Sequence, residues 1–494
     1  MSAPTAQAPG ASGSTAGSVT RAATLGVFAL AMIEVAAVLT PRNYPSMAEL
    51  GWSSVGWYII GLLLFFLPLS LVGAELATGW PKGGGVYAWV REAWGEKYGF
   101  VSIWCEWAEN VVWFPTVLAF IVATLSFGLF PGLAENHWLT FALMMIIFWG
   151  VTWLNMYGEK FSSKLTNFGA MFGVMLPTVV MIVLMLVYVF QGKTMAAPFD
   201  GPSSLMPTID LANLPYVQTV ILLFAGMEMA GFHALETKNP GRDFPRAILI
   251  ATVIIFTLTT LGTLAIVVTV NANDLSLAGG MMESIKLMLE SIGLPWLVAP
   301  MALILAFGSV AQLSTWLIGP AKGLGTAAAQ GDMPPRWRQH NSHGSPSAVL
   351  IIQAILATVL ALMFVVVPSA NSAYWILQAL TTLIIIVMYL LMFSAVIRLR
   401  YTQPNTKRAY RIPGGIPGVW IVGGVALVAL VFSFVIGLLP PGTTDINTAV
   451  YIAAMLIGAV AFSFIVPAVI YRFRKPDWKA PNWQAYLDGT EDEG

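Results

Sequence analysis

The sequence predicts an all-α membrane protein with twelve transmembrane helices, and three observations predict this class. First, 57% of the 494 residues are hydrophobic and only 10% are charged, whereas soluble domains carry about 25% charged residues. Second, twelve apolar stretches are each long enough to cross the hydrocarbon core, which takes about 20 residues of helix. Third, the lysines and arginines between these stretches are distributed asymmetrically. These observations exclude a soluble protein.

The N-terminal residues 1–20 are rich in Ala, Ser, Gly, Thr and Pro and carry no charge. This composition cannot bury enough apolar surface to become ordered, so we expect a disordered tail. No basic region precedes the first apolar run, and we expect no signal peptide. The one cysteine, Cys105, excludes an intramolecular disulfide, and four histidines leave little material for a metal site. We expect a transporter domain over 21–471 and a short cytoplasmic tail over 472–494.

The twelve predicted spans follow one another with short connections. The third and the eighth are long enough to tilt in the bilayer or to project from it. In chain order the spans are approximately 22–45, 54–78, 99–130, 138–157, 167–191, 212–235, 244–270, 294–327, 346–368, 372–399, 416–439 and 449–471.

The orientation follows from the excess of Lys and Arg that cytoplasmic loops carry. With the N-terminus inside, all but three of the 24 lysines and arginines lie at the cytoplasmic side of these spans. The exceptions are Arg42, Lys193 and Lys286. We therefore expect a multi-pass protein of the plasma (inner) membrane with both termini in the cytoplasm.

The connections outside the membrane are too short for a soluble domain. The largest external ones are 192–211 and 271–293. The second has a possible short amphipathic helix, because Met281, Ile285, Met288 and Leu289 share one helical face. The function must therefore lie among the membrane helices.

The first span contains a break. The stretch "LTPRNYP", residues 39–45, follows an apolar run and places two prolines around Arg42 and Asn43. Pro41 removes a helical hydrogen-bond donor, and Arg42 adds a permanent charge beside it.

The sixth span has a comparable break in "VILLFAGMEMAGFHALETKNPGRDFP", residues 220–245. Gly226 weakens the helix, Glu228 follows it, and Gly231 comes soon after. Many transporters consist of two inverted repeats with interrupted helices in matching positions. We predict repeats over about 21–191 and 212–400, followed by two additional helices over 416–471.

Unwound backbone in a membrane must pair with protein, water or a ligand, because lipid cannot satisfy it. Free N–H groups at a half-helix N-terminus attract a carboxylate, and free carbonyls attract an ammonium group. A zwitterionic amino acid carries both groups. Two facing breaks therefore favour an α-amino acid or a related amine as the substrate.

Four stretches resemble a known superfamily. They are "RNYPSMAELG" (42–51), "AELATGWPKGGGVYAWVREAWG" (74–95), "GMEMAGFHALETKNPGRDFPRA" (226–247) and "STWLIGPAKGL" (314–324). The chain resembles the amino acid–polyamine–organocation superfamily, and within it the glutamate/GABA antiporter family. The resemblance implies a LeuT-like five-plus-five inverted repeat with discontinuous helices 1 and 6, and amino acid transport by alternating access. By position it places the substrate pocket on the first break around 36–44, with Arg42 and Tyr44, and on Leu222, Phe224, Gly226, Glu228, Gln312 and Trp316.

Two features differ from the glutamate/GABA antiporters. Their longer C-terminal tail forms a pH-sensitive plug, whereas only 23 residues follow Tyr471 here. Arg42 stands where decarboxylase-coupled antiporters carry a neutral aromatic residue.

The role of Arg42 has two interpretations. The side chain could reach the outer headgroups or form an internal ion pair. Alternatively, its guanidinium binds a substrate carboxylate through two hydrogen bonds, which would favour acidic substrates. We prefer the second interpretation.

The carboxylates at membrane depth also have two interpretations each. Glu228 could couple transport to protonation or accept hydrogen bonds from the first break. Glu106 and Glu109 lie three residues apart on one helical face, so they could share a proton. His233 could sense pH near neutrality or be satisfied by a neighbour in its own helix. Candidates for proton coupling are therefore Glu228, Glu106 and His233.

The leading functional hypothesis is a secondary amino acid transporter, an antiporter that exchanges an amino acid for a related amino acid or amine. A proton-coupled symporter is the alternative. A membrane enzyme or a channel is a remote alternative. The glycine-rich stretch "PKGGGVY" (81–87) lacks the G-K-[ST] ending of a phosphate-binding loop, and no segment resembles the repeated selectivity-filter sequence of an ion channel. The expected partners are the substrate and the lipid bilayer. We expect no nucleic acid, metal or cofactor, and the sequence does not indicate the oligomeric state.

Overall fold

The computed structural model describes residues 26–81, 84–133, 136–157, 169, 171–228, 239–442 and 446–484. Within these ranges the regular structure is entirely helical. The α-helices are α1 (Val27–Val38), α2 (Tyr44–Ala48), α3 (Ser54–Gly61), α4 (Leu67–Gly79), α5 (Val86–Trp94), α6 (Glu96–Gly128), α7 (His137–Asn155), α9 (Leu176–Phe190), α10 (Thr219–Phe224), α11 (Pro240–Thr269), α12 (Gly280–Ser291), α13 (Val298–Ala329), α14 (Ser347–Ala361), α15 (Met363–Val366), α16 (Ala370–Thr402), α17 (Gly415–Gly437), α18 (Thr448–Val460) and α19 (Val466–Arg472). The predicted tail 1–20 lies outside the described residues.

Ten helical segments in the described residues are long and apolar enough to cross a membrane. They are Gly51–Gly79, Glu96–Gly128, His137–Asn155, Phe172–Phe190, Pro245–Thr269, Pro295–Ala329, Ser347–Val366, Ala370–Thr402, Gly415–Gly437 and Thr448–Arg472. Each one overlaps a predicted span. In their described residues, the two predicted spans with breaks, 22–45 and 212–235, have no helix of this length. Those residues include the shorter apolar helices Val27–Val38 and Leu214–Phe224.

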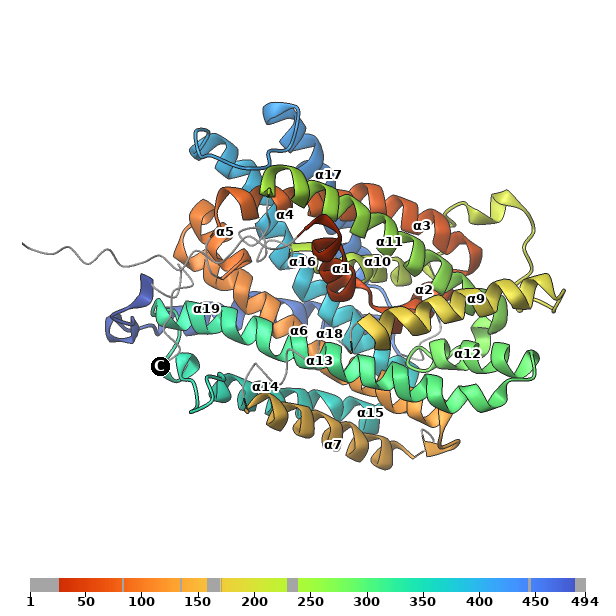
Figure 1. Ribbon diagram of the computed structural model, residues 1–494. Coiled ribbons are helices and arrows are strands. Elements are labelled where there is room, and N and C mark those ends of the chain that lie inside the picture. The colour runs from red at the N-terminus through yellow and green to blue at the C-terminus, as the bar shows by residue number, and fades with distance from the viewer. Residues whose placement is uncertain are drawn as a thin grey trace, which may run out of the picture.

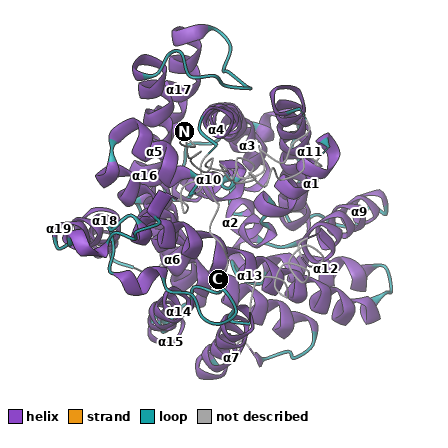
Figure 2. Cartoon of the chain, turned by 60° about the vertical axis from the view of Figure 1, so that its left-hand side comes forward, coloured by secondary structure: helices purple, strands orange, loops and turns teal. Residues whose placement is uncertain are grey.

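Two long helices, α6 and α16, run through the interior of the bundle. In the most apolar window of each, 83% of the residues are buried, compared with 22% in α7. A helix that is apolar on all sides is suited to such a position. Figures 1 and 2 show α10 and α2 near the centre as well, whereas α7, α9 and α17 lie at the periphery.

The first break has a local cause in the sequence. Helix α1 ends at Val38, and Leu39 is extended with ψ 114°. Thr40 has φ −130° and ψ 75°, outside the helical region. A residue before proline is sterically excluded from the helical conformation, and Pro41 lacks an N–H group, so the chain cannot continue α1. It restarts in the 3-10 helix η1 (Pro41–Asn43) and in α2.

The second break depends on a glycine. The chain enters through the 3-10 helix η7 (Leu214–Gln218) and α10, which ends at Phe224. Ala225 is extended, with φ −70° and ψ 150°. Gly226 has φ +105°, a conformation that residues with a side chain rarely adopt. The break predicted at Gly226 is confirmed, while Gly231 lies outside the described residues.

Two segments outside the long helices, 271–293 and the C-terminal segment, pack against the bundle. The amphipathic helix expected in 271–293 is confirmed as α12, whose buried residues include Met281, Ile285, Met288 and Leu289. At the other end of the bundle the C-terminal segment packs on the end of α13, where the Ala480 N–H donates to the Ala329 carbonyl at 2.7 Å. The tail predicted over 472–494 is therefore ordered at least to residue 484.

Candidate functional site

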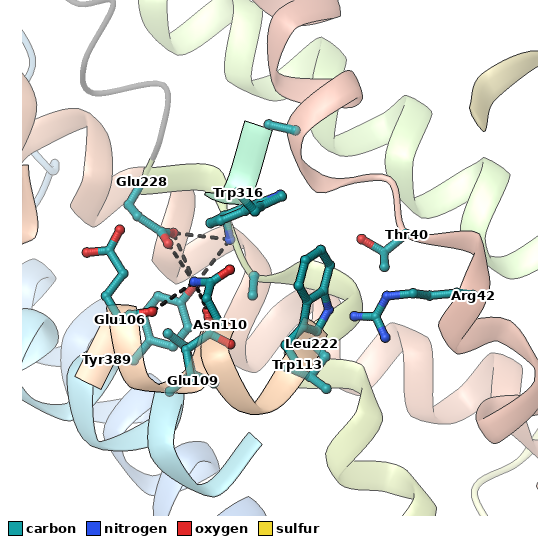
Figure 3. A pocket seen from close by; sticks show the side chains of 14 residues that line it. Thr40, Arg42, Glu106, Glu109, Asn110, Trp113, Leu222, Glu228, Trp316 and Tyr389 are labelled. Atoms are coloured by element: carbon teal, nitrogen blue, oxygen red, sulfur yellow. Dashed lines mark hydrogen bonds between the residues drawn. The ribbon is translucent and has the colours of Figure 1, made fainter. Parts of the chain in front are cut away.

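A cavity lies between the two breaks (Figure 3). Five helices and both breaks contribute to it. The lining residues are Ala37, Thr40, Arg42, Glu106, Glu109, Asn110, Trp113, Leu222, Ala225, Gly226, Glu228, Trp316, Ile385 and Tyr389.

At the second break, side chains satisfy the amide of Gly226. Its N–H group donates to Glu228 Oε2 at 3.2 Å and to the Tyr389 hydroxyl at 3.1 Å. The Tyr389 hydroxyl in turn donates to Glu228 Oε1 at 3.0 Å. Unwound backbone was expected to pair with protein, water or a ligand, and at Gly226 the partners are protein side chains, with the Glu228 carboxylate in the position that a substrate carboxylate would take.

At the first break, side chains satisfy the carbonyl groups. Gln312 Nε2 on α13 donates to the Leu39 carbonyl at 3.2 Å. The Thr40 hydroxyl donates to the Val38 carbonyl at 2.7 Å. Buried backbone polar groups require such partners. Of the partners that the sequence analysis allowed for unwound backbone, these two carbonyl groups have protein ones.

Arg42 is buried at one end of the cavity, with an exposed fraction of 3%. Its Nη1 donates to the Thr116 hydroxyl at 3.1 Å, and its guanidinium carbon lies 4.6 Å from the centre of the Trp113 ring. Its Nε has no hydrogen-bond partner. Among the described residues, no carboxylate lies within ion-pair distance of it. Burial argues against contact with headgroups, and the missing partner argues against an internal ion pair.

Two further carboxylates lie in the same cavity, on α6. Glu109 accepts a hydrogen bond from Asn110 Nδ2 at 2.7 Å. Glu106 is 6% exposed and lines the cavity. In the described part of the chain its carboxylate has no hydrogen-bond or ion-pair partner. Figure 3 shows both side chains on the same side as Glu228, with Trp113 between them and Arg42.

The predicted site residues fall into two groups. Those that line the cavity are Arg42, Leu222, Gly226, Glu228 and Trp316, together with the proton-coupling candidate Glu106. Those that do not line it are Tyr44, Phe224 and Gln312. Their roles in binding, like those of the first group, stay predictions.

Each residue outside the cavity has a packing or positioning contact. The ring of Tyr44 packs on Gly262, where a Cβ atom would come within 2.5 Å of it. Phe224 stacks on Phe66 with ring centres 4.5 Å apart. Gln312 holds the first break, as described above. His233 lies outside the described residues.

The sequence reasoning missed five lining residues, Asn110, Trp113, Ala225, Ile385 and Tyr389. A signal existed for the first two, because they follow Glu106 by four and seven residues and so share its helical face. Trp113 also contacts Trp316 edge-on, with ring centres 6.3 Å apart. For Tyr389 the signal was weaker: a hydroxyl within the apolar run of residues 383–393.

Comparisons with known proteins agree with this architecture. A sequence model of the amino acid permease family matches residues 24–462. An uncharacterized transporter of Legionella pneumophila is 39% identical over 444 residues, which are 90% of this chain and 95% of the relative.

Two relatives have named substrates. A glutamate/gamma-aminobutyrate antiporter of Lactococcus lactis is 30% identical over 454 residues, 90% of either chain. A probable agmatine/putrescine antiporter of the same species is 24% identical over 450 residues, 90% of this chain and 94% of the relative. The chain is thus a multi-pass membrane protein that belongs to the amino acid permease family, a family of transporters and not of enzymes.

Proposed function

We propose that the protein is a secondary active antiporter of the plasma membrane. It exchanges an amino acid for a related amino acid or amine by alternating access, with both termini in the cytoplasm. The family membership supports transport of such compounds, and the two antiporters among the relatives support exchange. The charge asymmetry of the loops supports the orientation.

We also propose twelve membrane crossings arranged as a five-plus-five inverted repeat. Ten described helices are long enough to cross alone. The two interrupted segments, α1 with α2 and η7 with α10, supply the remaining crossings. They occupy the first position of each predicted repeat, where transporters of this architecture place their substrate-binding breaks.

The cavity between the breaks is the observation that carries the proposal. It brings together Arg42, which lacks an anionic partner, and three carboxylates, Glu106, Glu109 and Glu228. A buried charge without a partner is costly, so ligand charges of the opposite sign are favoured there. The preference for an acidic substrate depended on Arg42 alone. The three carboxylates oppose an additional negative charge, and we now propose a zwitterionic or amine cargo.

Exchange by purified protein in lipid vesicles tests the proposal. Vesicles are loaded with each of the twenty common amino acids or their decarboxylated amines, and uptake of the labelled compound is measured from outside. We expect rapid uptake only with a matching internal compound. Equal uptake into empty vesicles would contradict exchange, and no uptake of any compound would contradict amino acid transport.

Proton-coupled symport is the second candidate, because Glu106 and Glu109 lie together in the cavity. A buried carboxyl group that faces the transport path can carry a proton. An inward pH gradient across vesicles with no internal substrate separates the two modes. Uptake driven by this gradient would favour symport, and its absence would leave exchange.

A further inference from the structure

We infer that the surface where α5 and α6 meet α16 and α17 binds the headgroup of an anionic phospholipid, with the Arg398 guanidinium on the phosphate. Four exposed aromatic side chains surround this arginine, Trp94, Tyr98, Tyr401 and Trp420. These five residues are called the Arg398 patch below. The inference goes beyond the proposed transport, because it concerns the lipid around the protein and not the cargo.

Contacts among the side chains connect the Arg398 patch. The guanidinium carbon of Arg398 lies 4.2 Å from the centre of the Trp94 ring, and Trp94 contacts Tyr98 edge-on with ring centres 6.3 Å apart. Tyr401 follows Arg398 by three residues in α16, so the two share a helical face. The Tyr401 hydroxyl accepts a hydrogen bond from Trp420 Nε1 at 2.9 Å. Helix α16 packs against both α5 and α17, and Figure 2 shows the three on the same side of the bundle.

Arg398 differs from its neighbours on the chain in having no carboxylate partner. Arg400 and Arg408 pair with the buried Glu75. Arg398 points outward and is exposed, and among the described residues no carboxylate lies within ion-pair distance of it. The exposed Lys97, beside Tyr98, is likewise without one in the described part of the chain. Two cations are therefore available to an anion at this surface.

The acidic residues close to the patch in sequence already have partners. Glu96 lies 3.1 Å from Arg91 Nη2 and 3.2 Å from Arg474 Nη1. Glu92 accepts a hydrogen bond from Gln403 Nε2 at 2.7 Å. Because these contacts compensate both carboxylates, the patch keeps a net positive charge.

The surroundings of the patch indicate a lipid and not a soluble anion. Tryptophan and tyrosine are enriched where a membrane meets water. Helix α17 continues from Trp420 with strongly exposed apolar side chains, among them Ile421 at 67% and Val428 at 71%. Lipid chains cover such a face in a membrane protein, and the headgroup then lies beside Trp420 and the rest of the patch. The charge asymmetry of the loops assigns this end to the cytoplasmic leaflet, where basic pockets between helices bind anionic headgroups.

The chemistry of Arg398 suits a phosphate. A guanidinium presents a planar fork of donors that matches phosphate oxygens. The cation–π contact with Trp94 holds this fork in place, so less side-chain freedom is lost when a phosphate binds. Orientation in the membrane requires only the positive charge of a loop. A stacked arginine within a group of aromatic side chains offers, in addition, a defined position for one headgroup.

The experiment measures the unfolding temperature of the purified protein in detergent with increasing phosphatidylglycerol or phosphatidylcholine of the same acyl chains. We expect phosphatidylglycerol to raise this temperature in a saturable way and further than phosphatidylcholine does, because a ligand of the folded state stabilises it. In Arg398→Gln the apparent affinity for phosphatidylglycerol should fall about tenfold or more, as expected for a lost hydrogen bond to a charged group. The lipid-dependent rise is the measured quantity, so a stability change of the lipid-free variant does not affect it.

Two further variants serve as controls. Arg246→Gln removes an exposed arginine from the start of α11, outside the patch. It makes the same change of charge and should alter the affinity by less than about twofold, because an isolated surface charge contributes little. Arg398→Lys keeps the charge but loses the fork of donors, and its affinity should lie between those of the wild type and Arg398→Gln.

Three outcomes would overturn the inference. Equal rises with the two lipids would show that the wild type has no preference for an anionic headgroup, and this result needs no variant. Equal losses in Arg398→Gln and Arg246→Gln would indicate general attraction to positive charge. A rise of the same size with soluble glycerol 3-phosphate would indicate a site for free anions. The measurement involves no transport, so its outcome is independent of the proposed exchange.

Discussion

Two buried charged clusters differ in how their charges are satisfied. The first lies where the ends of α4 and α16 meet. Glu75 there accepts hydrogen bonds from Arg400 Nε and Nη2, both at 2.6 Å, and from the Ile412 N–H group at 2.9 Å. Arg408 Nη1 lies 3.3 Å from the same carboxylate. The second cluster is the cavity, where Arg42 and Glu106 are buried without a partner of opposite charge among the described residues.

The difference indicates what each cluster does. Burying a charge is costly unless hydrogen bonds and an opposite charge compensate it. In the Glu75 cluster the chain itself pairs the buried carboxylate with two arginines and thereby fixes the loop after α16 against α4, although Arg400 Nη1 and Arg408 Nε and Nη1 have no hydrogen-bond partner among the described residues. In the cavity the chain leaves the compensation incomplete. A ligand with complementary charges completes it, so the incomplete cluster is the one suited to binding.

The largest expected effect comes from breaking the complete cluster. Glu75→Gln leaves Arg400 and Arg408 buried without an anion, and the loss of one partner of a buried pair costs about 3–5 kcal/mol. We expect a large fall in the unfolding temperature of the purified protein in detergent. The exposed Glu290→Gln variant should show no such fall. A Glu75→Gln protein as stable as the wild type would remove the contrast between the two clusters.

The sequence indicated part of this contrast. Both breaks could be predicted, because Pro41 and Gly226 act on the backbone of their own segments. The apolar face of α12 could also be predicted, because it depends only on the spacing of apolar residues within that segment.

Contacts between distant segments could not be predicted in this way. Gln312 meets Leu39 across more than 250 residues, and Tyr389 meets Glu228 across more than 150. Nothing in the local sequence of either partner specifies the other, because helix packing alone brings them together. For this reason the sequence could not show that side chains of α13 and α16 satisfy backbone groups at the two breaks.

The second-largest expected effect concerns the cavity, the cluster with incomplete compensation. Arg42→Gln removes a buried cation that has no carboxylate partner, so we expect little change in unfolding temperature. Binding should suffer instead. Affinity for an amino acid substrate should fall about tenfold to a hundredfold, since a hydrogen bond to a charged group is worth about 1.5–3 kcal/mol. The amine formed from that substrate by loss of its carboxylate should bind nearly as before, as measured by competition during exchange.

Either of two results would contradict this assignment of Arg42. A fall in stability as large as that of Glu75→Gln would make the arginine structural. An equal loss of affinity for the amino acid and for its amine would show that Arg42 does not bind the carboxylate of the substrate.

A further buried carboxylate, Asp332, lies between the two extremes. It accepts a hydrogen bond from the Tyr87 hydroxyl at 3.0 Å and lies 3.5 Å from Arg474 Nη1. Its side chain is 2% exposed, whereas that of Arg474 is 41% exposed and is shared with Glu96. Compensation here is partial, because water screens the arginine. Burial therefore prevails and raises the pKa of Asp332 to about 6.

The smallest expected effect follows from this raised pKa. Between pH of about 4 and about 6 the unfolded chain has lost the proton while the folded one keeps it, so stability falls as pH rises through this window. Asp332→Asn does not titrate, and its stability relative to the wild type should grow by about 1–2 kcal/mol across the same window. Unfolding temperatures at several pH values measure this difference, with the exposed Asp477→Asn as the control. If the difference in stability between Asp332→Asn and the wild type did not change with pH, the charge of Asp332 would be as well compensated as that of Glu75. Asp332 would then not be intermediate between the two clusters.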